Sequence, residues 1–440
     1  MMYQKYDAYK DSGVQWLGDI PNDWEVVRFR DICNFSKGLN ITKENLQDTG
    51  IPCVNYGEVH SKYGFEVSPE RNELKCVSED YLKNSPKSLL AYGDFIFADT
   101  SEDIDGSGNF TYLNSHNLTF AGYHTVIVRP KPYINVRYLA YVFDSLSFRH
   151  QVRTAVKGVK VYSITKAILK DTAVWLPNVD RQYEIAQFLD QKTTQIDQAI
   201  AIKEQQIALL NERKQIVIQQ AVTKGLDPNV KMKDSGVEWI GEIPEHWEIF
   251  ANRAIFSERN ESGRDGLPLL SVSIHTGVSD EEMDEDTNVQ GRVKIEDKSK
   301  YILVKKGDIA FNMMRAWQGA IGAVSVDGMV SPAYIVAKPT KRIDANFFEY
   351  QYRCPEFIQQ MGRYSKGITD FRKRLYWDGF KQLSTLVPPI SEQLKIIEFI
   401  KALNNQIETV VSVKTQQIQK LKEYKTTLIN DAVTGKIKVA

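Results

Sequence analysis

The sequence predicts an α/β (α+β) protein made by tandem duplication, with two mixed α/β domains that are each followed by a long helix. Three observations carry this prediction. A sixteen-residue segment occurs twice, an apolar heptad stripe occurs twice, and a diverged stretch with alternating strand and helix signals precedes each stripe. At 440 residues the chain is also too long for a single hydrophobic core.

The repeated segment opens each half of the chain. Residues 10–25 have the sequence KDSGVQWLGDIPNDWE and residues 233–248 have KDSGVEWIGEIPEHWE, with eleven of sixteen positions identical. Such identity at one constant spacing indicates a duplication of about half the chain. We interpret its tryptophans as packing residues at the entrance of each domain; they are Trp16, Trp24, Trp239 and Trp247.

The stretches between segment and stripe, residues 26–175 and 249–387, barely resemble one another but share short landmarks. A Gly-Asp turn at Gly93-Asp94 and at Gly307-Asp308 precedes an apolar strand. Each stretch ends in a strand that a proline terminates, Pro177 in the first half and Pro388 in the second. Further strands are expected at 126–128 and 334–336, and helices at 143–156 and 347–361.

The apolar stripe has the alternating three- and four-residue steps of a helix that packs lengthwise on another helix. We predict the pairing positions Leu189, Ile196, Ile200, Ile207 and Leu210 in the first copy, and Ile400, Ile407, Val411, Ile418 and Leu421 in the second. Each helix would be roughly 60 Å long. Polar residues recur at matched stripe positions, Thr193 with Asn404, Lys203 with Lys414 and Lys214 with Lys425. This recurrence favours one shared seam between the two helices; the alternative is two surface helices, each on its own domain.

Composition restricts the class of protein. The formal net charge is zero, so any nucleic-acid surface must be a local patch. The four cysteines show no CxxC pairing, which favours reduced thiols and a cytoplasmic location. There is neither a signal-peptide core at the N-terminus nor a run of about 20 apolar residues, so no membrane span is expected.

Catalytic and metal-binding signatures are absent from the sequence. There is no phosphate loop, no GxGxxG, no HExxH and no GxSxG, and the six histidines lack metal-ligand spacing. The sequence Val387-Pro388-Pro389-Ile390 lacks the flanking residues of an amino-methyltransferase motif. The acidic run 280–286 is interpreted as a solvated loop. We therefore predict no catalytic residue and no metal site in this chain.

Positive charge does cluster beside glycine and aromatic residues before the last strand of each domain. The predicted DNA-binding residues are Lys157, Lys160 and Tyr162 in the first half and Lys366, Arg372, Lys373 and Arg374 in the second, with Arg315 as a weaker candidate. Basic groups beside glycine suit phosphate contact, and arginine suits guanine edges. The alternative is a helix C-terminus, at which lysine complements the dipole and Gly158 or Gly367 forms a left-handed cap.

Together these landmarks resemble the specificity subunit of type I restriction–modification enzymes. The resemblance rests on the repeated Leu/Ile-Gly-Asp/Glu-Ile-Pro…Trp opening, the Gly-Asp strand, and a helix start containing Gln182, Ile185 and Phe188, matched by Gln393, Ile396 and Phe399. It covers the whole chain in the family's order of domain, helix, domain, helix.

The resemblance implies two target recognition domains separated by two long antiparallel coiled-coil helices that are related by a pseudo-two-fold axis. The expected bounds are 1–180 for the first domain, 181–223 for the central helix, 224–232 for a linker, 233–389 for the second domain and 390–440 for the distal helix. Each domain would recognise one half of a bipartite, asymmetric double-stranded DNA site. The helices would space the domains and dock two methyltransferase subunits, and motor-nuclease subunits would complete the enzyme. S-adenosylmethionine, ATP and magnesium would belong to these partners.

Two diverged domains with similar helices independently suggest two different ligands and two identical partners. A DNA duplex suits such an arrangement, since equivalent major-groove faces recur about every 34 Å. An alternative of another class is a coiled-coil scaffold whose two domains bind proteins. The zero net charge favours this scaffold, whereas the matched basic segments favour DNA.

Overall fold

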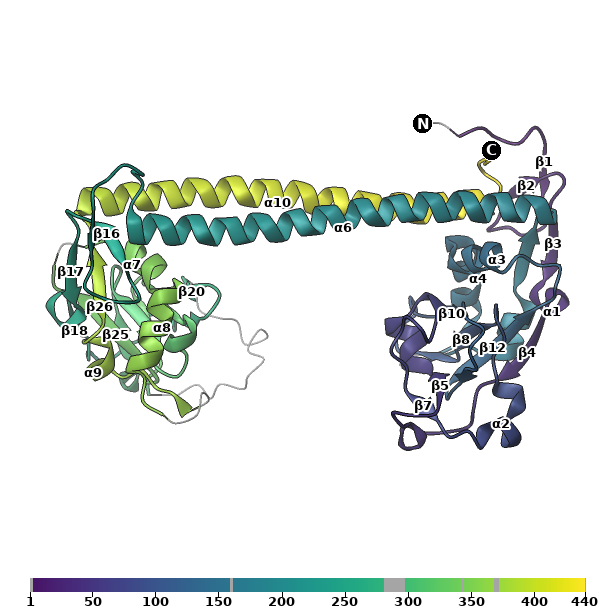
Figure 1. Ribbon diagram of the computed structural model, residues 1–440, viewed down its shortest axis with the longest axis horizontal. Helices are drawn as coiled ribbons and strands as arrows, with labels where there is room; N and C mark the ends of the chain where they lie inside the picture. The colour runs from purple at the N-terminus through teal and green to yellow at the C-terminus, as the bar shows by residue number, and fades with distance from the viewer. Residues whose placement is uncertain (1–2, 159–160, 281–296, 342, 368–371, 440) are drawn as a thin grey trace. The chain divides into compact units, whose positions relative to one another are not determined.

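The computed structural model describes residues 3–158, 161–280, 297–341, 343–367 and 372–439 (Figure 1). The chain forms two compact units, unit 1 with residues 1–203 and 415–440 and unit 2 with residues 204–414. The unit boundaries fall inside two long helices, α6 (Val179–Lys224) and α10 (Ile390–Val433). Each unit therefore contains one mixed α/β domain and a part of each long helix.

The domain of unit 1 is built on a five-stranded sheet in the order β4-β12-β8-β10-β6. Its strands are β4 (Cys33–Lys37), β12 (Thr125–Pro130), β8 (Phe95–Ala98), β10 (Phe110–Leu113) and β6 (Phe65–Val67), antiparallel except for the β10–β6 pair. A second, three-stranded sheet contains β11 (Phe120–Ala121), β5 (Ile51–Val54) and β7 (Cys76–Val77). The remaining strands form pairs: β1 (Tyr9–Asp11) with β2 (Asp19–Pro21), β3 (Glu25–Arg28) with β14 (Ala173–Leu176), and β9 (Thr100–Ser101) with β13 (Tyr162–Ser163).

The domain of unit 1 also contains short helices and helical turns. They are α1 (Phe29–Ile32), α2 (Tyr81–Asn84), α3 (Val136–Asp144), α4 (Leu146–Ala155), α5 (Lys166–Asp171), the 3₁₀ turns η1 (Lys43–Asn45) and η3 (Pro86–Ser88), and the π-helical turn η2 (Glu58–Lys62). The single helix expected at 143–156 is wrong, because Ser145 is extended and separates α3 from α4. The Ser145 hydroxyl accepts a hydrogen bond from the Phe148 amide at 3.2 Å, which caps the start of α4.

Unit 2 repeats this plan with fewer strands. Its main sheet has the order β18 (Phe256–Glu258), β25 (Tyr334–Pro339), β22 (Ile309–Asn312), β23 (Ile321–Ala323), all antiparallel. The two-stranded pairs are β15 (Met232–Asp234) with β16 (Glu242–Pro244), β17 (Glu248–Ala251) with β26 (Ser384–Val387), β19 (Val272–Ser273) with β20 (Gly277–Val278), and β21 (Ile302–Val304) with β24 (Gly328–Val330).

The helices of unit 2 are again short before the long helix. They are α7 (Ala345–Tyr352), α8 (Pro355–Tyr364), α9 (Trp377–Phe380), η4 (Asn252–Ala254), η6 (Lys298–Lys300) and η7 (Ala316–Gln318). The single helix expected at 347–361 is also wrong. Pro355 begins α8 and Cys354 before it is extended, because proline has no amide hydrogen to donate within a continuing helix and restricts the preceding residue.

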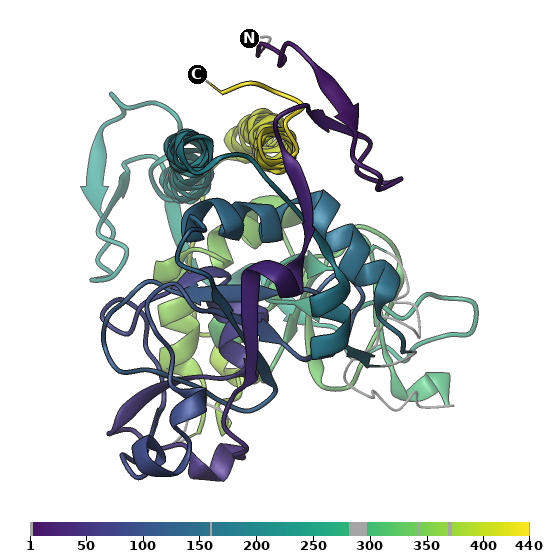
Figure 2. The same ribbon diagram turned by 90° about the vertical axis from the view of Figure 1, so that its right-hand side faces the viewer.

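Within each unit the parts of α6 and α10 run in opposite directions. They lie side by side, as the end-on view of unit 1 shows (Figure 2). In unit 1 the Lys203 ammonium donates to the Gln417 side chain at 2.7 Å, and the Lys425 ammonium donates to the Asp197 carboxylate at 2.7 Å. Higher residue numbers in α6 therefore lie beside lower residue numbers in α10, as in an antiparallel pair. All ten predicted pairing residues are buried or half-buried. Burial of a stripe on two antiparallel helices is the geometry of a coiled coil.

Of the matched polar stripe residues, Thr193 and Asn404 bond to the domains. The Thr193 hydroxyl lies 3.2 Å from the Tyr141 hydroxyl of α3, and Asn404 donates to the Tyr350 hydroxyl of α7 at 3.3 Å. These two positions are therefore polar because each long helix bonds to its own domain there.

The repeated opening segment packs on the end of a long helix in both units. In unit 1 a Cβ on Gly435, just after α10, would lie 2.3 Å from Pro21 and 3.5 Å from Trp24. In unit 2 the equivalent glycine is Gly225, just after α6, and its Cβ would lie 3.5 Å from Trp247. Both glycines have positive φ, +72° and +79°, as a helix C-cap in the left-handed region requires. The fully buried Trp24 and Trp247 are packing residues, as predicted.

Candidate nucleic-acid interface

The basic segment of unit 1 forms a closed loop between α4 and α5. Lys157 and Ser163 face each other in an antiparallel bridge, so the chain reverses direction between them. The loop is tight at Gly158, where a Cβ would lie 2.1 Å from the Val161 carbonyl oxygen. This close approach of two backbone segments explains the glycine.

The basic segment of unit 2 forms the equivalent loop. Lys366 and Arg374 make an antiparallel bridge with two amide-to-carbonyl bonds of 2.8 Å. Gly367 has φ +140°, and a Cβ there would lie 2.5 Å from the Arg372 carbonyl oxygen. In both units a lysine-glycine pair thus stands at the first closing position.

The two loops are attached to their sheets in the same way. In unit 1 the Ile164 amide donates to the Asp99 carbonyl at 2.8 Å, just after β8, and β13 pairs with β9. In unit 2 the Leu375 amide donates to the Met313 carbonyl at 2.8 Å, just after β22. Two loops of unlike sequence are therefore held at the same end of the equivalent sheet strand.

The alternative that these glycines cap helices is wrong. α4 ends at Ala155 and its C-cap Val156 is extended, with φ −75° and ψ 148°. α8 ends at Tyr364 and its C-cap Ser365 is also extended. Gly158 and Gly367 follow these extended residues and belong to the loops, so their role is to let the loops close.

The loop of unit 2 lies against a second basic and aromatic element. The Lys373 ammonium lies 5.1 Å from the centre of the Trp317 ring, within the range of a cation–π contact. The Trp317 indole donates to the Met314 carbonyl at 3.0 Å, and the exposed Arg315 stands directly before the same turn, η7, without a capping bond from its side chain. Lysine, arginine and an ordered indole are groups that contact phosphates and bases.

The segment beside the unit 1 loop has a different charge. After β9 the chain has the acidic residues Glu102, Asp103 and Asp105, and Arg153 of α4 forms an ion pair with Asp105 at 3.3 Å. Carboxylates accept hydrogen bonds from cytosine and repel phosphate, whereas arginine favours guanine. The two loops therefore present different chemistry on the same framework.

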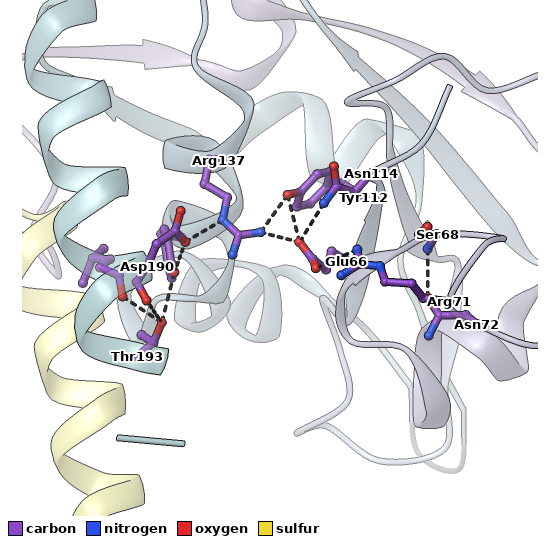
Figure 3. Close-up of polar contacts among 11 residues, drawn as sticks. Glu66, Ser68, Arg71, Asn72, Tyr112, Asn114, Arg137, Asp190 and Thr193 are labelled. Atoms are coloured by element: carbon purple, nitrogen blue, oxygen red, sulfur yellow. Dashed lines mark hydrogen bonds and ion pairs between the residues drawn. The ribbon is translucent and has the colours of Figure 1, made fainter. Parts of the chain in front are cut away.

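A network of hydrogen bonds and ion pairs around Arg137 joins the domain of unit 1 to α6 (Figure 3). The Arg137 guanidinium of α3 donates to Asp190 of α6 at 2.6 Å and to the Tyr112 hydroxyl of β10 at 2.7 Å, and it also pairs with Glu66 of β6. It lies 4.8 Å from the centre of the Phe65 ring. One arginine thus joins a sheet edge, a domain helix and the long helix.

The network also holds Glu66 ionised. Burial alone would raise the pKa of Glu66, but the charge of Arg137 and hydrogen bonds from Arg137, Tyr112 and Arg71 outweigh it and lower this pKa below its ordinary value of 4.5.

A matched glutamine fixes the start of each long helix. Gln182 accepts the Asn135 amide at 2.9 Å and donates to the Pro177 carbonyl at 3.0 Å. Gln393 accepts the Asp344 amide at 2.9 Å and donates to the Pro388 carbonyl at 2.8 Å. Both glutamines are buried, so each bonds the backbone before its own helix to the cap of a domain helix.

Comparison with known proteins finds a matching family model and relatives of similar length. Residues 21–212 match the family model of the type I restriction modification DNA specificity domain. The putative type I restriction enzyme MjaX specificity subunit of Methanocaldococcus jannaschii is 24% identical, over 100% of this chain and 99% of the relative. The EcoKI specificity subunit of Escherichia coli K12 is 21% identical, over 96% and 90%. Residues 21–212 therefore form a type I restriction modification DNA specificity domain. The chain as a whole is similar to type I specificity subunits over its full length.

Solved structures share the fold of this chain. The HsdS subunit from Thermoanaerobacter tengcongensis matches with a TM-score of 0.54 and 13% identity, over 95% of this chain and 98% of that one. A chain from a structure on complex assembly and conformational transition of the type I R-M system matches with a TM-score of 0.64 and 13% identity, over 94% and 98%.

Most of the predicted DNA-contact residues lie in the two loops. Lys157 is exposed and Tyr162 half-buried in the first loop, whereas Lys160 lies outside the described residues. Lys366, Arg372, Lys373 and Arg374 belong to the second loop, with Arg315 on the neighbouring turn. The acidic run, apart from the exposed Asp280, lies outside the described residues.

Metal-ligating side chains do not cluster in the described ranges. No group of three or more His, Cys, Asp or Glu side chains there could hold a metal ion. The four cysteines are buried free thiols, and burial raises the pKa of Cys354 to about 12. Among the described helices, none is long and apolar enough to cross a membrane.

Proposed function

We propose that this chain is the non-catalytic DNA-recognition subunit of a type I restriction–modification complex, in which each unit recognises one half of a bipartite double-stranded DNA site. The observation that carries the proposal is the pair of equivalent loops. Lys157 to Ser163 and Lys366 to Arg374 have the same closing bridge, the same tight glycine and the same attachment beyond a sheet strand. The framework is kept while the exposed residues differ, as recognition of two different half-sites requires.

In this proposal the second loop contacts phosphates through Lys366, Arg372 and Lys373, and Arg315 contacts a base edge beside it. Tyr162 and Lys157 act in the first loop. Because the formal net charge of the chain is zero, the positive charge that contacts phosphates in this proposal is confined to the loops rather than spread over the surface. The zero net charge also suits a scaffold that binds proteins, but the matched basic loops favour DNA.

The partners in this proposal are two methyltransferase subunits and the motor-nuclease subunits, in the cytoplasm. S-adenosylmethionine, ATP and magnesium act on those partners, and this chain contributes recognition and assembly. Support comes from the similarity to type I specificity subunits over the whole chain and from the two long helices, which expose apolar residues such as Ile202, Leu209 and Val413.

The test is a mobility-shift titration of the chain with the modification subunit of its own system, on duplex fragments of the source genome. Arg372→Ala, Lys373→Ala and Arg374→Ala combined should weaken binding and reduce its salt dependence by about one unit of slope per lost phosphate contact. A control variant removes the same charge elsewhere in unit 2, with Lys298→Ala, Lys300→Ala and Lys305→Ala. Equal binding by the loop variant and the wild type would contradict the proposal.

A further inference from the structure

One histidine of unit 1 lies directly beside the attachment of the first basic loop. His124 stands immediately before β12, and the amide of Asp99, immediately after β8, donates to the His124 carbonyl at 3.1 Å. The Asp99 carbonyl in turn accepts the Ile164 amide that attaches the loop, at 2.8 Å. Two backbone hydrogen bonds therefore connect His124 to the loop that contacts DNA in the proposed function.

The side chain of His124 is held with a defined proton position. Its Nδ1 lies 3.1 Å from the Asp99 carboxylate. Because an ionised carboxylate only accepts hydrogen bonds, Nδ1 carries a proton, and in the neutral imidazole Nε2 is then a hydrogen-bond acceptor. The His124 side chain is 61% exposed, so a ligand can reach this acceptor.

The backbone of His124 also indicates that the side chain is used. His124 has φ +54°, in the left-handed region that is uncommon for residues other than glycine. Glycine would adopt this conformation without strain, yet the chain has an exposed histidine there. Strained residues of this kind concentrate at binding sites.

The equivalent position of unit 2 has the same backbone bonds and different side chains. The Met313 amide donates to the Ala333 carbonyl at 3.3 Å, and the Met313 carbonyl accepts the Leu375 amide at 2.8 Å. Asp99 and His124 thus correspond to Met313 and Ala333. A hydrogen-bonded pair in one unit is replaced by two apolar residues in the other, which suits two different half-sites.

The surface around the His124–Asp99 pair is acidic. The exposed Glu102 and Asp103 follow β9, a few residues beyond Asp99. Burial raises the pKa of the Tyr56 hydroxyl, and the charges of these three carboxylates raise it further, so all three lie near this one side chain. Hydrogen-bond acceptors therefore gather beside His124.

We propose that His124 is a specificity-determining residue of unit 1 that accepts a hydrogen bond from the N4 amino group of a cytosine in the major groove, and that Asp99 is its positioning residue. Cytosine presents only a donor at this edge. Guanine and thymine present acceptors, and adenine places its N7 acceptor beside its amino group, so an acceptor-rich surface disfavours all three. This inference rests on the proposed function and extends it by naming one base of the first half-site.

The test measures the base preference of the full chain together with the modification subunit of its system. Sequencing of DNA that the complex has methylated at about pH 8, where free imidazoles are neutral, identifies both half-sites. Methylation rates are then compared on duplexes with each of the four base pairs at each position. The wild type should prefer cytosine at one position of the half-site that stays unchanged when residues 249–387 are exchanged.

His124→Gly removes the ring and suits the left-handed backbone, so the variant should fold, as circular dichroism can check. It should reduce the preference for cytosine at that position about tenfold and leave the other half-site unchanged. His124→Asn also tolerates the left-handed backbone and offers both a donor and an acceptor. This variant should shift the preference at the same position toward adenine.

Asp99→Ala tests the positioning role and should also lower the preference for cytosine. Asp99→Asn should retain most of it, because the amide oxygen can still accept from Nδ1. His116→Ala is the matched control and should keep the wild-type preference. His116 is an exposed histidine of unit 1 whose ring stacks on that of Tyr92, before β8 rather than after it, at 4.8 Å.

A His124→Gly variant that keeps the wild-type preference for cytosine would overturn the inference and leave DNA recognition standing. The same conclusion would follow from a first half-site without a cytosine preference. Methylation by His124→Gly that falls equally for all four bases would give His124 a structural role only and would also overturn the inference. Failure of the wild-type complex to distinguish any DNA sequence would overturn both this inference and the proposed function.

Discussion

Lys203 of α6 donates a hydrogen bond of 2.7 Å to Gln417 of α10, and Lys414 of α10 donates one of 2.7 Å to Gln206 of α6. The second bond is the first with the two helices exchanged, at a constant spacing of 211 residues. The first lies in unit 1 and the second in unit 2. Exposed bonds of this kind contribute little stability, about 0.5 kcal/mol each, so their value is in fixing one register of the seam.

The seam should depend on its apolar residues. Ile418 is 8% exposed on α10, and Ile418→Asp would bury an unpaired carboxylate. We expect the free energy of unfolding to fall by about 3 kcal/mol, measured by chemical denaturation. The control is Gln416→Asp on the exposed side of the same helix, with an expected change below about 0.5 kcal/mol. Equal stability of both variants would contradict the packed seam.

The Arg137–Glu66 network should make unit 1 sensitive to acid. The folded-state pKa of Glu66 lies below its unfolded value of about 4.5, so its contribution is fully present above pH 4.5 and is lost as pH falls through the folded pKa. Glu66→Gln should cost about 1 to 2 kcal/mol at pH 7. The difference from the wild type should shrink in acid, as thermal unfolding between pH 3 and 7 can measure.

The exposed Glu44 provides the matched control for Glu66. Glu44→Gln should leave the melting temperature close to that of the wild type across this pH range. A difference between Glu66→Gln and wild type that stays constant from pH 7 to pH 3 would show that the charge of Glu66 does not stabilise the unit.

Loop closure should require glycine in the second loop. In Gly367→Ala the added Cβ would lie 2.5 Å from the Arg372 carbonyl, at a φ that L side chains rarely adopt, so the loop must open. We expect at least tenfold weaker DNA binding by mobility shift with the modification subunit present. Gly362→Ala is the control, because Gly362 lies in α8 with no atom within 4 Å of its Cβ.

The control should bind DNA normally and should be more stable than wild type by about 0.5 to 1 kcal/mol, since alanine favours the helix. Normal binding by Gly367→Ala would mean that the closed loop is not needed for recognition.

Each domain should determine its own half-site. Exchange of residues 249–387 for the same block of a related specificity subunit keeps α6 and α10 intact. The methylated positions, mapped by sequencing of DNA modified by the complex, should change in one half of the site and stay the same in the other. A change in both halves would contradict independent recognition.

The sequence by itself determined the duplication, the two long helices and their paired stripe. These features repeat along the chain, so periodicity and identity reveal them: the eleven shared positions of the opening segment, and the stripe from Leu189 to Leu210 with its second copy. The lysine-glycine pairs were also visible, because both loops need a residue without a side chain at the same point of closure.

Only the tertiary structure decided which distant groups meet. Thr193 bonds to Tyr141 of the domain rather than across the seam, and Arg137 joins Glu66, Tyr112 and Asp190 from three separate elements. Ser145 ends one helix and caps the next, although the apolar pattern continues through it. Local pattern specifies which residues are buried, but the partner of a buried polar group is set by how the elements pack, and no spacing along the chain records that.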